Sequence, residues 1–444
     1  MHTPDATHKS SAVKPWLARS AIVAIAWAGP AIHVLAADAA PAAAPAAREP
    51  LQSIAAILAL APAEVDAKPE AVIRGVVTST LYPAFVIQDG ESPIFVAGYG
   101  RVEAEDGSAV AIERGMIVEI EGTVVAAGYA PAIRGHRTRV VGRGPVPPPV
   151  PADLSRLARG GDEGRWVTVQ GVVHGFGERT AGRSNSIPML MLDAGGWPLS
   201  ISWLAADQPF DPGRLVDAKI QVTGLASALR NSRGQFVSPS VLVTNPDDVT
   251  ILTTAPDDPF AGEITPLDEL GRFVVQQRTG HRIRTEGIVS YAAPGLLFLQ
   301  NPSAAVRIDL APAAAVVSAA EPRFAPGDRV RVAGFLDMGR SIASLTFAVA
   351  RRVGSGAPPD PEPLAVTEIA RVANAFRKTT WNTEPGSYDG RLVRCTGVVE
   401  ALEKTPAGLT ATLSSPGGQW FATLGDQPAP PAVARLAVGN TVAV

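Results

Sequence analysis

Few side chains in this sequence stand at spacings that could perform chemistry. Three of its six histidines fall within the first 36 residues, and the other three, His136, His174 and His281, stand singly in separate short runs. The one cysteine, Cys395, lies inside an alternating run, which indicates a small buried hydrophobic residue. The sequence contains no His-x-x-x-His, no cysteine pair, no Gly-x-Ser-x-Gly and no phosphate-binding loop. We therefore expect no catalytic site, no metal and no cofactor in this chain.

Two pairs of adjacent acids, Asp247-Asp248 and Asp257-Asp258, raise the question of calcium. Both pairs adjoin prolines, and no further ligands follow at the spacing of a calcium-binding loop. Adjacent acids beside proline are typical of turns, and we interpret both pairs in that way.

The best candidate for ligand binding is a set of basic and aromatic residues between positions 176 and 235. Two long loops, residues 176–187 and 226–235, contain arginines, and two tryptophans flank the strand between them. Guanidinium groups and indoles on one face would bind a flat or anionic ligand by paired hydrogen bonds and stacking. The predicted ligand-binding residues are Arg179, Arg183, Trp197, Trp203, Arg230, Asn231 and Arg233. The alternative is that the arginines are solvated in long loops and the tryptophans belong to a core.

A repeat positions these residues. A glycine followed by two β-branched residues recurs at four places, and we call these the first marker glycines: Gly75, Gly171, Gly287 and Gly397. In the last three copies an opening glycine lies seven residues upstream, at Gly164, Gly280 and Gly390. A second marker glycine ends a later alternating run in the first three copies, at Gly122, Gly224 and Gly334. Self-similarity at a long period predicts a string of like modules.

Each copy reads as a short helix followed by short Val- and Ile-rich strands between turn residues, which predicts an all-β fold. Five strands in about 90 residues, with a glycine bending the first, fit a small five-stranded Greek-key barrel of the OB-fold type. We predict a tandem array of four OB-fold-like barrels, each preceded by a short helix, with the fourth truncated. The predicted modules cover residues 53–144, 152–253, 264–353 and 364–444, and proline-rich linkers separate them.

The N-terminus has the pattern of a secretory signal peptide. Lys9, Lys14 and Arg19 precede an apolar run, residues 21–35, that ends in small residues. We assign residues 1–36 to this signal and residues 37–52, rich in Ala and Pro, to a disordered leader. The mature chain is therefore expected to be extracytoplasmic. Membrane attachment would come only through an uncleaved anchor or a missing C-terminal span.

The composition argues against nucleic acid as a partner. The formal net charge is −3 and aromatic residues make up 6% of the chain, whereas nucleic-acid affinity rests mainly on cationic contacts to phosphates. We expect instead a small or oligomeric ligand of the cell envelope, anionic or saccharide, and no nucleic acid.

The fourth module ends early by comparison with the others. Its second marker glycine would fall at position 444 or 445, and the sequence stops at Val444 inside that strand. A module without its last strand would leave an open sheet edge. We therefore expect this sequence to be a fragment of a longer chain.

The repeated segments resemble the tandem OB-like modules in the extracytoplasmic sensor region of certain bacterial membrane histidine kinases. The segments that carry the resemblance are residues 72–77, 85–90, 115–122, 128–133 and 326–334. In that family such modules precede a transmembrane helix and a cytoplasmic kinase core. The resemblance spans about residues 53–444, which contain none of the kinase's own motifs.

The expected function is therefore the ligand-binding or sensor region of a two-component signal-transduction receptor. Two alternatives stay open from the residues themselves. The first alternative is a free-standing secreted binding or spacer protein. The second is a nucleic-acid-binding OB protein, which the net charge of the chain disfavours.

Overall fold

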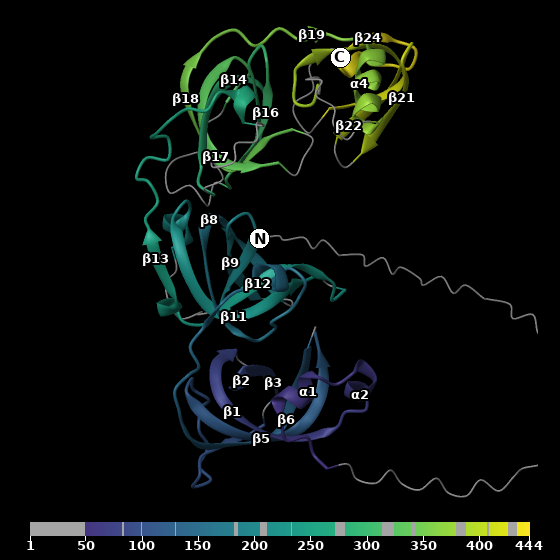
Figure 1. Ribbon diagram of the computed structural model, residues 1–444. Helices are drawn as coiled ribbons and strands as arrows, with labels where there is room; N and C mark the ends of the chain where they lie inside the picture. Colours follow the sequence, from purple (N-terminus) through teal and green to yellow (C-terminus); the bar gives the residue numbers. More distant parts are fainter. Residues whose placement is uncertain are drawn as a thin grey trace, which may run out of the picture. The chain divides into compact units, whose positions relative to one another are not determined.

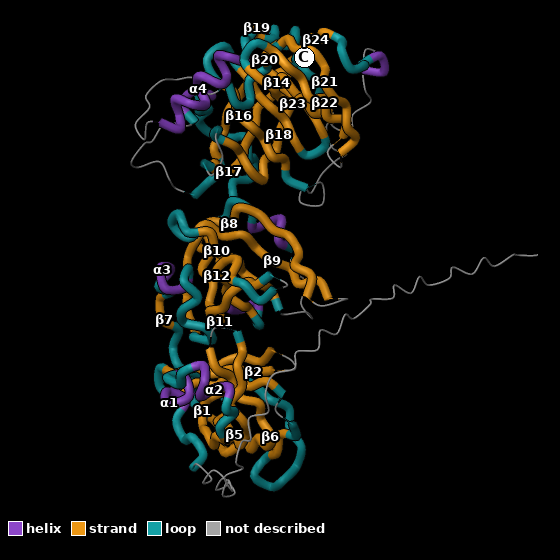
Figure 2. Tube along the Cα trace, turned by 90° about the vertical axis from the view of Figure 1, so that its right-hand side faces the viewer, coloured by secondary structure: helices purple, strands orange, loops and turns teal. Residues whose placement is uncertain are grey.

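The structure is a computed structural model, and it describes part of the chain. It covers residues 49–444 except for residues 82–83, 99, 129, 182–184, 205–210, 232, 271–279, 313–323, 339–341, 379–387, 406–407 and 425–432. The predicted signal peptide and all but the last four residues of the predicted leader lie outside the described residues, as does Arg183. Strands dominate the described chain and helices are few and short (Figures 1 and 2), so the predicted all-β class is confirmed.

Module one begins with two short helices and continues as a sheet. Ser53 caps the first helix through its side chain, as Ser commonly does. The elements are α1 (Ile54–Leu58), α2 (Pro62–Asp66), β1 (Glu70–Leu81), β2 (Ala84–Asp89), β3 (Ser92–Ala97), β4 (Val102–Glu103), β5 (Met116–Ala127) and β6 (Ala130–Arg143).

Module two has the same order with an added strand at each end. Asp153 caps its helix by accepting hydrogen bonds from the next turn. The elements are β7 (Val150–Pro151), α3 (Leu154–Leu157), β8 (Trp166–Ala181), β9 (Asn185–Asp193), β10 (Pro198–Trp203), η1 (Pro212–Leu215), β11 (Lys219–Arg230), β12 (Phe236–Val243), η2 (Pro246–Asp248) and β13 (Val249–Thr253).

Modules three and four depart from the predicted short helix in opposite directions. Module three begins with a single 3-10 turn, η3 (Leu267–Glu269), and module four with α4 (Val366–Lys378), which has 13 residues. The other elements of module three are β14 (Ile283–Ala293), β15 (Leu296–Gln300), β16 (Ala305–Leu310), β17 (Asp328–Asp337) and β18 (Ser344–Ser355). Those of module four are β19 (Glu362–Pro363), β20 (Val393–Arg394), β21 (Thr396–Thr405), β22 (Gly408–Ser415), β23 (Gly418–Leu424), η5 (Val433–Arg435) and β24 (Thr441–Ala443).

One circuit of strand pairing recurs in the first three modules. We count five main strands in each module: β1, β2, β3, β5 and β6 in module one, β8 to β12 in module two, and β14 to β18 in module three. The first strand pairs with the second and the fourth, the second with the third, and the fourth with the fifth, all antiparallel. The third strand runs parallel to the fifth and joins the two ends of the sheet. In module three the circuit β14-β15-β16-β18-β17 is a closed barrel. Among the described residues of module four the sheet has the order β23-β22-β21-β24 and is not closed.

The first marker glycines explain how the first strand bends. A side chain at Gly171 would place its Cβ 2.4 Å from the Asp193 carbonyl oxygen on the neighbouring strand. In all four modules the pairing register of the first strand shifts shortly after this glycine, as at a β-bulge. A bulge increases the local bend and twist of a strand, which a small barrel needs. The predicted role of these glycines in bending the first strand agrees with this geometry.

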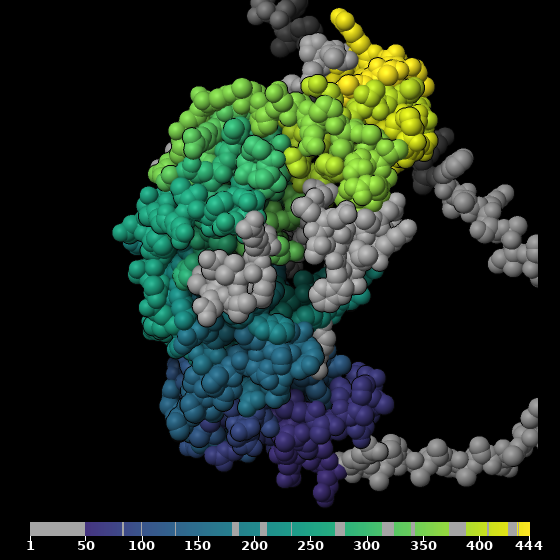
Figure 3. Space-filling view, turned by 45° about the horizontal axis from the view of Figure 1, so that its top comes forward, coloured from purple at the N-terminus to yellow at the C-terminus, as the bar shows by residue number. Residues whose placement is uncertain are grey.

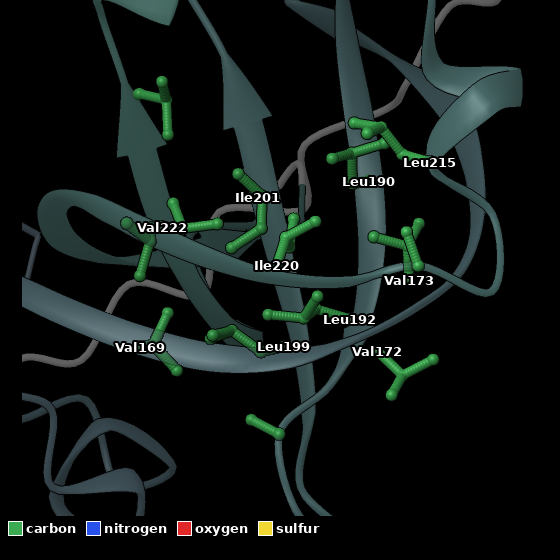
Figure 4. Packing of buried hydrophobic residues seen from close by; sticks show 14 of the residues in the cluster. Val169, Val172, Val173, Leu190, Leu192, Leu199, Ile201, Leu215, Ile220 and Val222 are labelled. Atoms are coloured by element: carbon green, nitrogen blue, oxygen red, sulfur yellow. The ribbon is translucent and has the colours of Figure 1, made fainter. Parts of the chain in front are cut away.

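The modules have aliphatic cores that are not fully separate. In module two, Leu190, Leu192, Leu199, Ile201 and Ile220 converge from neighbouring strands (Figure 4). The same cluster includes Phe335 of β17, and another cluster joins Val86 of module one to Trp166 and Leu225 of module two. The array is therefore not four discrete barrels, a point that the sequence left open, because Leu225 and Phe335, which follow the second marker glycines, pack into the module before them.

Candidate binding face and module junctions

The residues predicted to bind ligand lie in different environments. Asn231 organises the β11–β12 turn, because its Oδ1 accepts the N–H groups of Arg233 and Gln235. Arg233 is exposed in the same turn. Arg179 pairs with Ile187 across the β8–β9 hairpin and is half-buried, and its Nε has no hydrogen-bond partner among the described residues. Asn231 therefore shapes a turn, Arg179 is half-buried in a hairpin and Arg233 is exposed, so these three side chains do not share one environment.

Arg230 lies at the contact between modules one and two. Its Nη2 is 3.4 Å from a carboxylate oxygen of Glu163, which also accepts a hydrogen bond from Ser227. A Cβ added to Gly128, in the β5–β6 turn of module one, would lie 2.0 Å from the same Nη2. Burial raises the pKa of Glu163, and the Arg230 charge opposes that rise. Arg230 thus belongs to a packed contact between modules.

The two predicted tryptophans differ in exposure. Trp203 is 6% exposed and packs in the module two core, so its ring faces cannot stack on a ligand. Trp197, at the β9–β10 turn, is 45% exposed. Within the described residues, the predicted set is therefore not one open binding face.

The acidic pairs and two arginines on β6 of module one also have structural partners. Asn245 accepts the N–H of Asp247, and Asp248 forms an ion pair of 3.3 Å with Arg114. Asp258 accepts the N–H of Phe260. These contacts are those of turns and of a junction between modules. On the β5–β6 hairpin, glutamates of β5 pair with Arg137 and Arg139.

The opening glycines reveal a feature that the sequence patterns did not predict: each one packs against the preceding module. All three have positive φ, +80° at Gly164, +74° at Gly280 and +77° at Gly390. An added Cβ would lie 3.1 Å from the Phe95 ring at Gly164, 3.0 Å from Asp193 Oδ2 at Gly280, and 2.8 Å from Ile342 Cδ1 at Gly390. Glycine is needed here for both conformation and close approach.

The residue after the opening glycine also contacts the preceding module. Arg165 lies 3.6 Å from Glu91 in the β2–β3 turn, and Arg391 donates a hydrogen bond of 3.3 Å to the Pro302 carbonyl in the β15–β16 turn. At the middle junction this residue is His281, whose Nδ1 lies 2.9 Å from Asp217 Oδ1. At the first and third junctions an arginine therefore reaches a turn of the preceding module, whereas at the second junction a histidine contacts a buried aspartate instead.

An apolar residue after the second marker glycine completes the first two junctions. Leu225 is fully buried in a cluster with Val86 and Trp166. Phe335 is 1% exposed, and its ring stacks on His174 with 4.1 Å between ring centroids. Module one has the polar Thr123 at this position, where its hydroxyl contacts His136 and Glu70.

The surface that receives the next module is a row of outward-facing positions on the first three strands. Strand register makes these positions equivalent in all four modules, and we call them the docking row. The rows are Ser79–Val86–Phe95, Gly175–Met191–Ser200, Tyr291–Phe298–Arg307 and Ala401–Thr412–Phe421.

The four docking rows are covered to different extents. The first-strand position is buried in modules one and two, at Ser79 and Gly175, and exposed in modules three and four, at Tyr291 and Ala401. The third-strand position is half-buried in the first three modules and 70% exposed at Phe421 in module four. In module two, Phe347 covers Gly175, where an added Cβ would lie 2.5 Å from its ring. The four rows thus share a place in the fold and differ in how far they are occupied.

The junction between modules two and three contains buried ionisable groups. Asp217 is 1% exposed at φ +74°, and its Oδ1 accepts from the Arg282 N–H as well as facing His281. Arg284 Nη2 is 4.0 Å from Asp217 Oδ2. The His174 Nε2–H donates to the Gly280 carbonyl at 2.7 Å. The positive φ at Asp217 is one that Asp and Asn adopt more readily than most residues.

Burial changes the proton affinity of two groups at this junction. Desolvation lowers the pKa of His174, although the Gly280 carbonyl, Asp193 and Asp217 oppose the effect. Desolvation also lowers the pKa of Arg282, against the attraction of Asp217. The half-buried His174 is therefore favoured in its neutral form, as expected for a base partly removed from water.

The docking row of module three combines aromatic and basic side chains. Tyr291 meets the Phe298 ring edge-on at 6.2 Å, and Arg307 lies 6.0 Å from the same ring. Asp309 holds the Arg307 guanidinium through contacts of 2.9 and 2.7 Å. Gly390 approaches Phe298 from module four. Sequence reasoning missed this row because its members come from three strands with no shared motif.

Within the part of the chain that the structure describes, no three His, Cys, Asp or Glu side chains are grouped to hold a metal ion. No helix among the described residues is long and apolar enough to cross a membrane.

Comparison with known proteins gives only remote likenesses. No family model matches the chain, and no curated protein matches it. A replication protein A heterotrimer bound to ssDNA is 9% identical over 58% of this chain and 77% of that chain, with a TM-score of 0.22. The p204 HINb domain is 10% identical over 44% of this chain and 100% of that chain, with a TM-score of 0.20. A multidomain protein from Streptococcus pneumoniae with nucleic acid binding domains is 11% identical over 70% and 83%, with a TM-score of 0.13. Scores this low support no assignment of fold or ligand.

Proposed function

We propose that this chain is an extracytoplasmic array of OB-fold-like modules that acts as a scaffold. The shared pairing circuit, with a parallel third and fifth strand, is that of a five-stranded Greek-key barrel. One observation carries the scaffold proposal: each of the three opening glycines packs within van der Waals reach of the preceding module. Such contacts fix each module to the one before it.

The contacts favour a scaffold over a flexible string. Interfaces between domains of one chain usually permit motion unless they are well packed. Here each junction adds side-chain contacts to the glycine: Leu225 with Val86, Phe335 with His174, and the Leu392 N–H with Gln300 Oε1 at 2.8 Å. Of the functions considered from the sequence, a spacer is the one these contacts support best.

Spin-label distances between modules two and three test the scaffold. Val237 and Val353 are 59% and 43% exposed and can carry labels as cysteines, with Cys395→Ala removing the native thiol. We expect a narrow distance distribution that Gly280→Val broadens, because the added side chain cannot fit against Asp193. Gly295→Val is the matched control, since Gly295 also has positive φ but has nothing within 4 Å of an added Cβ. A broad distribution in the parent would refute the scaffold.

The docking row of module three supports ligand binding as a second candidate function. Gly390 of module four approaches the Phe298 ring, whereas Tyr291 beside it is 41% exposed. Tyr291 and Arg307 present an aromatic and a cationic group beside this junction, which suits a flat or anionic envelope ligand. Titration of the chain with envelope oligosaccharides, with Tyr291→Ala and Arg307→Ala as variants, tests this role. Binding that both variants leave unchanged would remove the row from consideration.

The receptor role expected from the kinase resemblance stays a proposal, as does the extracytoplasmic location. Fixed junctions would allow binding at one module to alter the position of an attached output domain. Cell fractionation with an antibody against the first three modules tests both points. A band in the membrane fraction far above 46.0 kDa supports a receptor, and a cytoplasmic band would exclude the proposed location.

A further inference from the structure

The docking row of module four is open. Phe421 on β23 is 70% exposed, and Val398 on β21, beside the row, is 39% exposed. The row residues Ala401, Thr412 and Phe421 are directly paired across three strands and carry no charge. A contiguous apolar patch, rather than a single exposed aromatic, marks an interaction surface, and Val398 and Ala401 add apolar side chains to the exposed face around Phe421.

Strand register shows what covers the same position elsewhere. Phe421 pairs with Thr412 as Phe95 pairs with Val86 in module one. Phe95 is half-buried against the cluster of Val86, Trp166 and Leu225. An added Cβ on Gly164 would lie 3.1 Å from its ring. In module one, therefore, this aromatic position receives the opening glycine and the Leu225 side of the next module.

The other end of the array is polar, which distinguishes the two ends. Lys68 stands seven residues before Gly75, where later modules have the opening glycine, and it adopts φ +52° with its side chain exposed. Thr123 replaces the apolar residue that follows the second marker glycine, and it contacts His136 and Glu70. Module one therefore lacks the features with which modules two to four dock.

We infer that the docking row of module four, centred on Phe421, binds one further β-barrel module of the kind that modules two to four represent. That partner module would present an opening glycine at positive φ to the Phe421 ring. It would place an apolar side chain, equivalent to Leu225 or Phe335, beside the row. A second copy of this chain docking through module one is a poorer match, because module one has Lys68 and Thr123 at the two equivalent positions.

The test adds such a module to the whole chain. Val444 is equivalent to Ile120 of module one by strand register. Residues 121–253, which supply the end of the fourth strand, a fifth strand, the linker and the module that docks on Phe95, are therefore joined after Val444. The reference chain carries residues 121–144 alone, and amide hydrogen exchange is measured in β22 and β23 of both chains. We expect exchange in these strands to be slower by about tenfold or more in the extended chain than in the reference chain, as for newly buried sheet. Phe421→Glu in the extended chain should restore the rate of the reference chain. Val353→Glu, an exposed apolar residue in none of the docking rows, should leave the slow exchange unchanged.

Two outcomes would overturn the inference. In the first, exchange in β22 and β23 is unchanged from the reference chain, while the peptides of β8 to β12, which come from both copies of module two, exchange as slowly as in the parent chain. The added module would then be folded but undocked. The other is a concentration-dependent dimer of the unextended chain, seen by sedimentation, that Phe421→Glu abolishes. That result would assign the surface to a second copy instead.

Discussion

The first and second junctions use the same backbone device with different side chains. Both place an opening glycine on the preceding module and bury the residue after the second marker glycine. At the first junction that residue is Leu225, among Val86 and Trp166. At the second it is Phe335, stacked on His174 beside the buried carboxylate of Asp217.

The comparison indicates that backbone positions determine where a module docks and that side chains determine how the junction responds. The centre of the first junction is apolar, with ion pairs such as Arg114–Asp248 around it. The second holds ionisable groups that are largely out of water. Apolar contacts depend little on pH, whereas a buried base or carboxylate depends on its protonation state. The two junctions should therefore differ in their response to substitution and to acid.

The largest effect is expected from truncating the aromatic at the second junction. Phe335→Ala should lower the free energy of unfolding of module three by about 3–5 kcal/mol, because it leaves a cavity and removes the stack on His174. A loss at the upper end of this range would also separate module three from module two. Leu225→Ala should cost about 2–5 kcal/mol at the first junction. Urea unfolding followed by far-UV circular dichroism measures both. A Phe335→Ala loss below that of Leu225→Ala would contradict the assigned importance of the aromatic stack.

Removing the buried charge comes next. Asp217→Asn keeps the shape, the tolerance for positive φ and an acceptor for the Arg282 backbone N–H, but it removes the negative charge that attracts the Arg282 and Arg284 guanidinium groups. We expect a loss of about 1–3 kcal/mol, the usual range for a buried polar group deprived of its partner.

Asp211→Asn is the matched control, since Asp211 is exposed in the same module, and it should change stability little. Equal stabilities of the two variants would mean that the Asp217 carboxylate is not part of the second junction's energy.

The sequence predicted the modules well because their markers are local. Each first marker glycine, such as Gly171, is required by the strand directly beside it, and hydrophobic alternation identifies that strand. The buried position of Cys395, 4% exposed, followed from the same alternation. The docking contacts were not predictable in this way. Gly280 touches Asp193, 87 positions earlier in the chain (280 − 193), and no local pattern links them.

Among the described residues, the predicted ligand-binding set does not form one face, for a related reason. Loop length and residue type suggested that Arg230 and Trp203 faced a ligand, but each satisfies a contact that depends on the fold. Arg230 pairs with Glu163 beside Gly128 of another module, and Trp203 fills the core. Alternation does place Trp203 on the same side as Leu199 and Ile201, which was the available signal for a core residue.

A smaller change in stability is expected from substitutions at the opening position, where a residue must both adopt positive φ and fit closely against the preceding module. Gly280→Ala should destabilise by about 1–2 kcal/mol, since it adds left-handed backbone strain and crowds Asp193. Lys68→Gly should change stability by less than about 1 kcal/mol, because relief of strain and the greater entropy of the unfolded chain oppose each other. Thermal unfolding of the two variants measures the difference. If the two variants change stability by the same amount in opposite directions, the positive φ alone accounts for glycine at the opening position, without any contribution from close packing.

The smallest effect expected is a pH dependence confined to the second junction. Burial lowers the pKa of His174 below its ordinary value of 6.5, while Asp193, Asp217 and His281 face the ring. The unfolded chain therefore binds a proton at this site more readily than the folded chain. The contribution of the neutral ring to stability is fully present above about pH 6.5 and is lost as the pH falls below that value. Since less than one proton is involved, the slope should stay below about 1.4 kcal/mol per pH unit.

His174→Gln should remove this slope between pH 7.5 and about 5.5, because an amide keeps a donor for the Gly280 carbonyl but does not titrate in this range. His136→Gln, at an exposed position on β6, serves as the control and should leave the slope in place. The measurement is the free energy of unfolding at each pH. If His174→Gln retains the parent's slope, the acid response comes from another group, and the contrast between the two junctions rests on their packing alone.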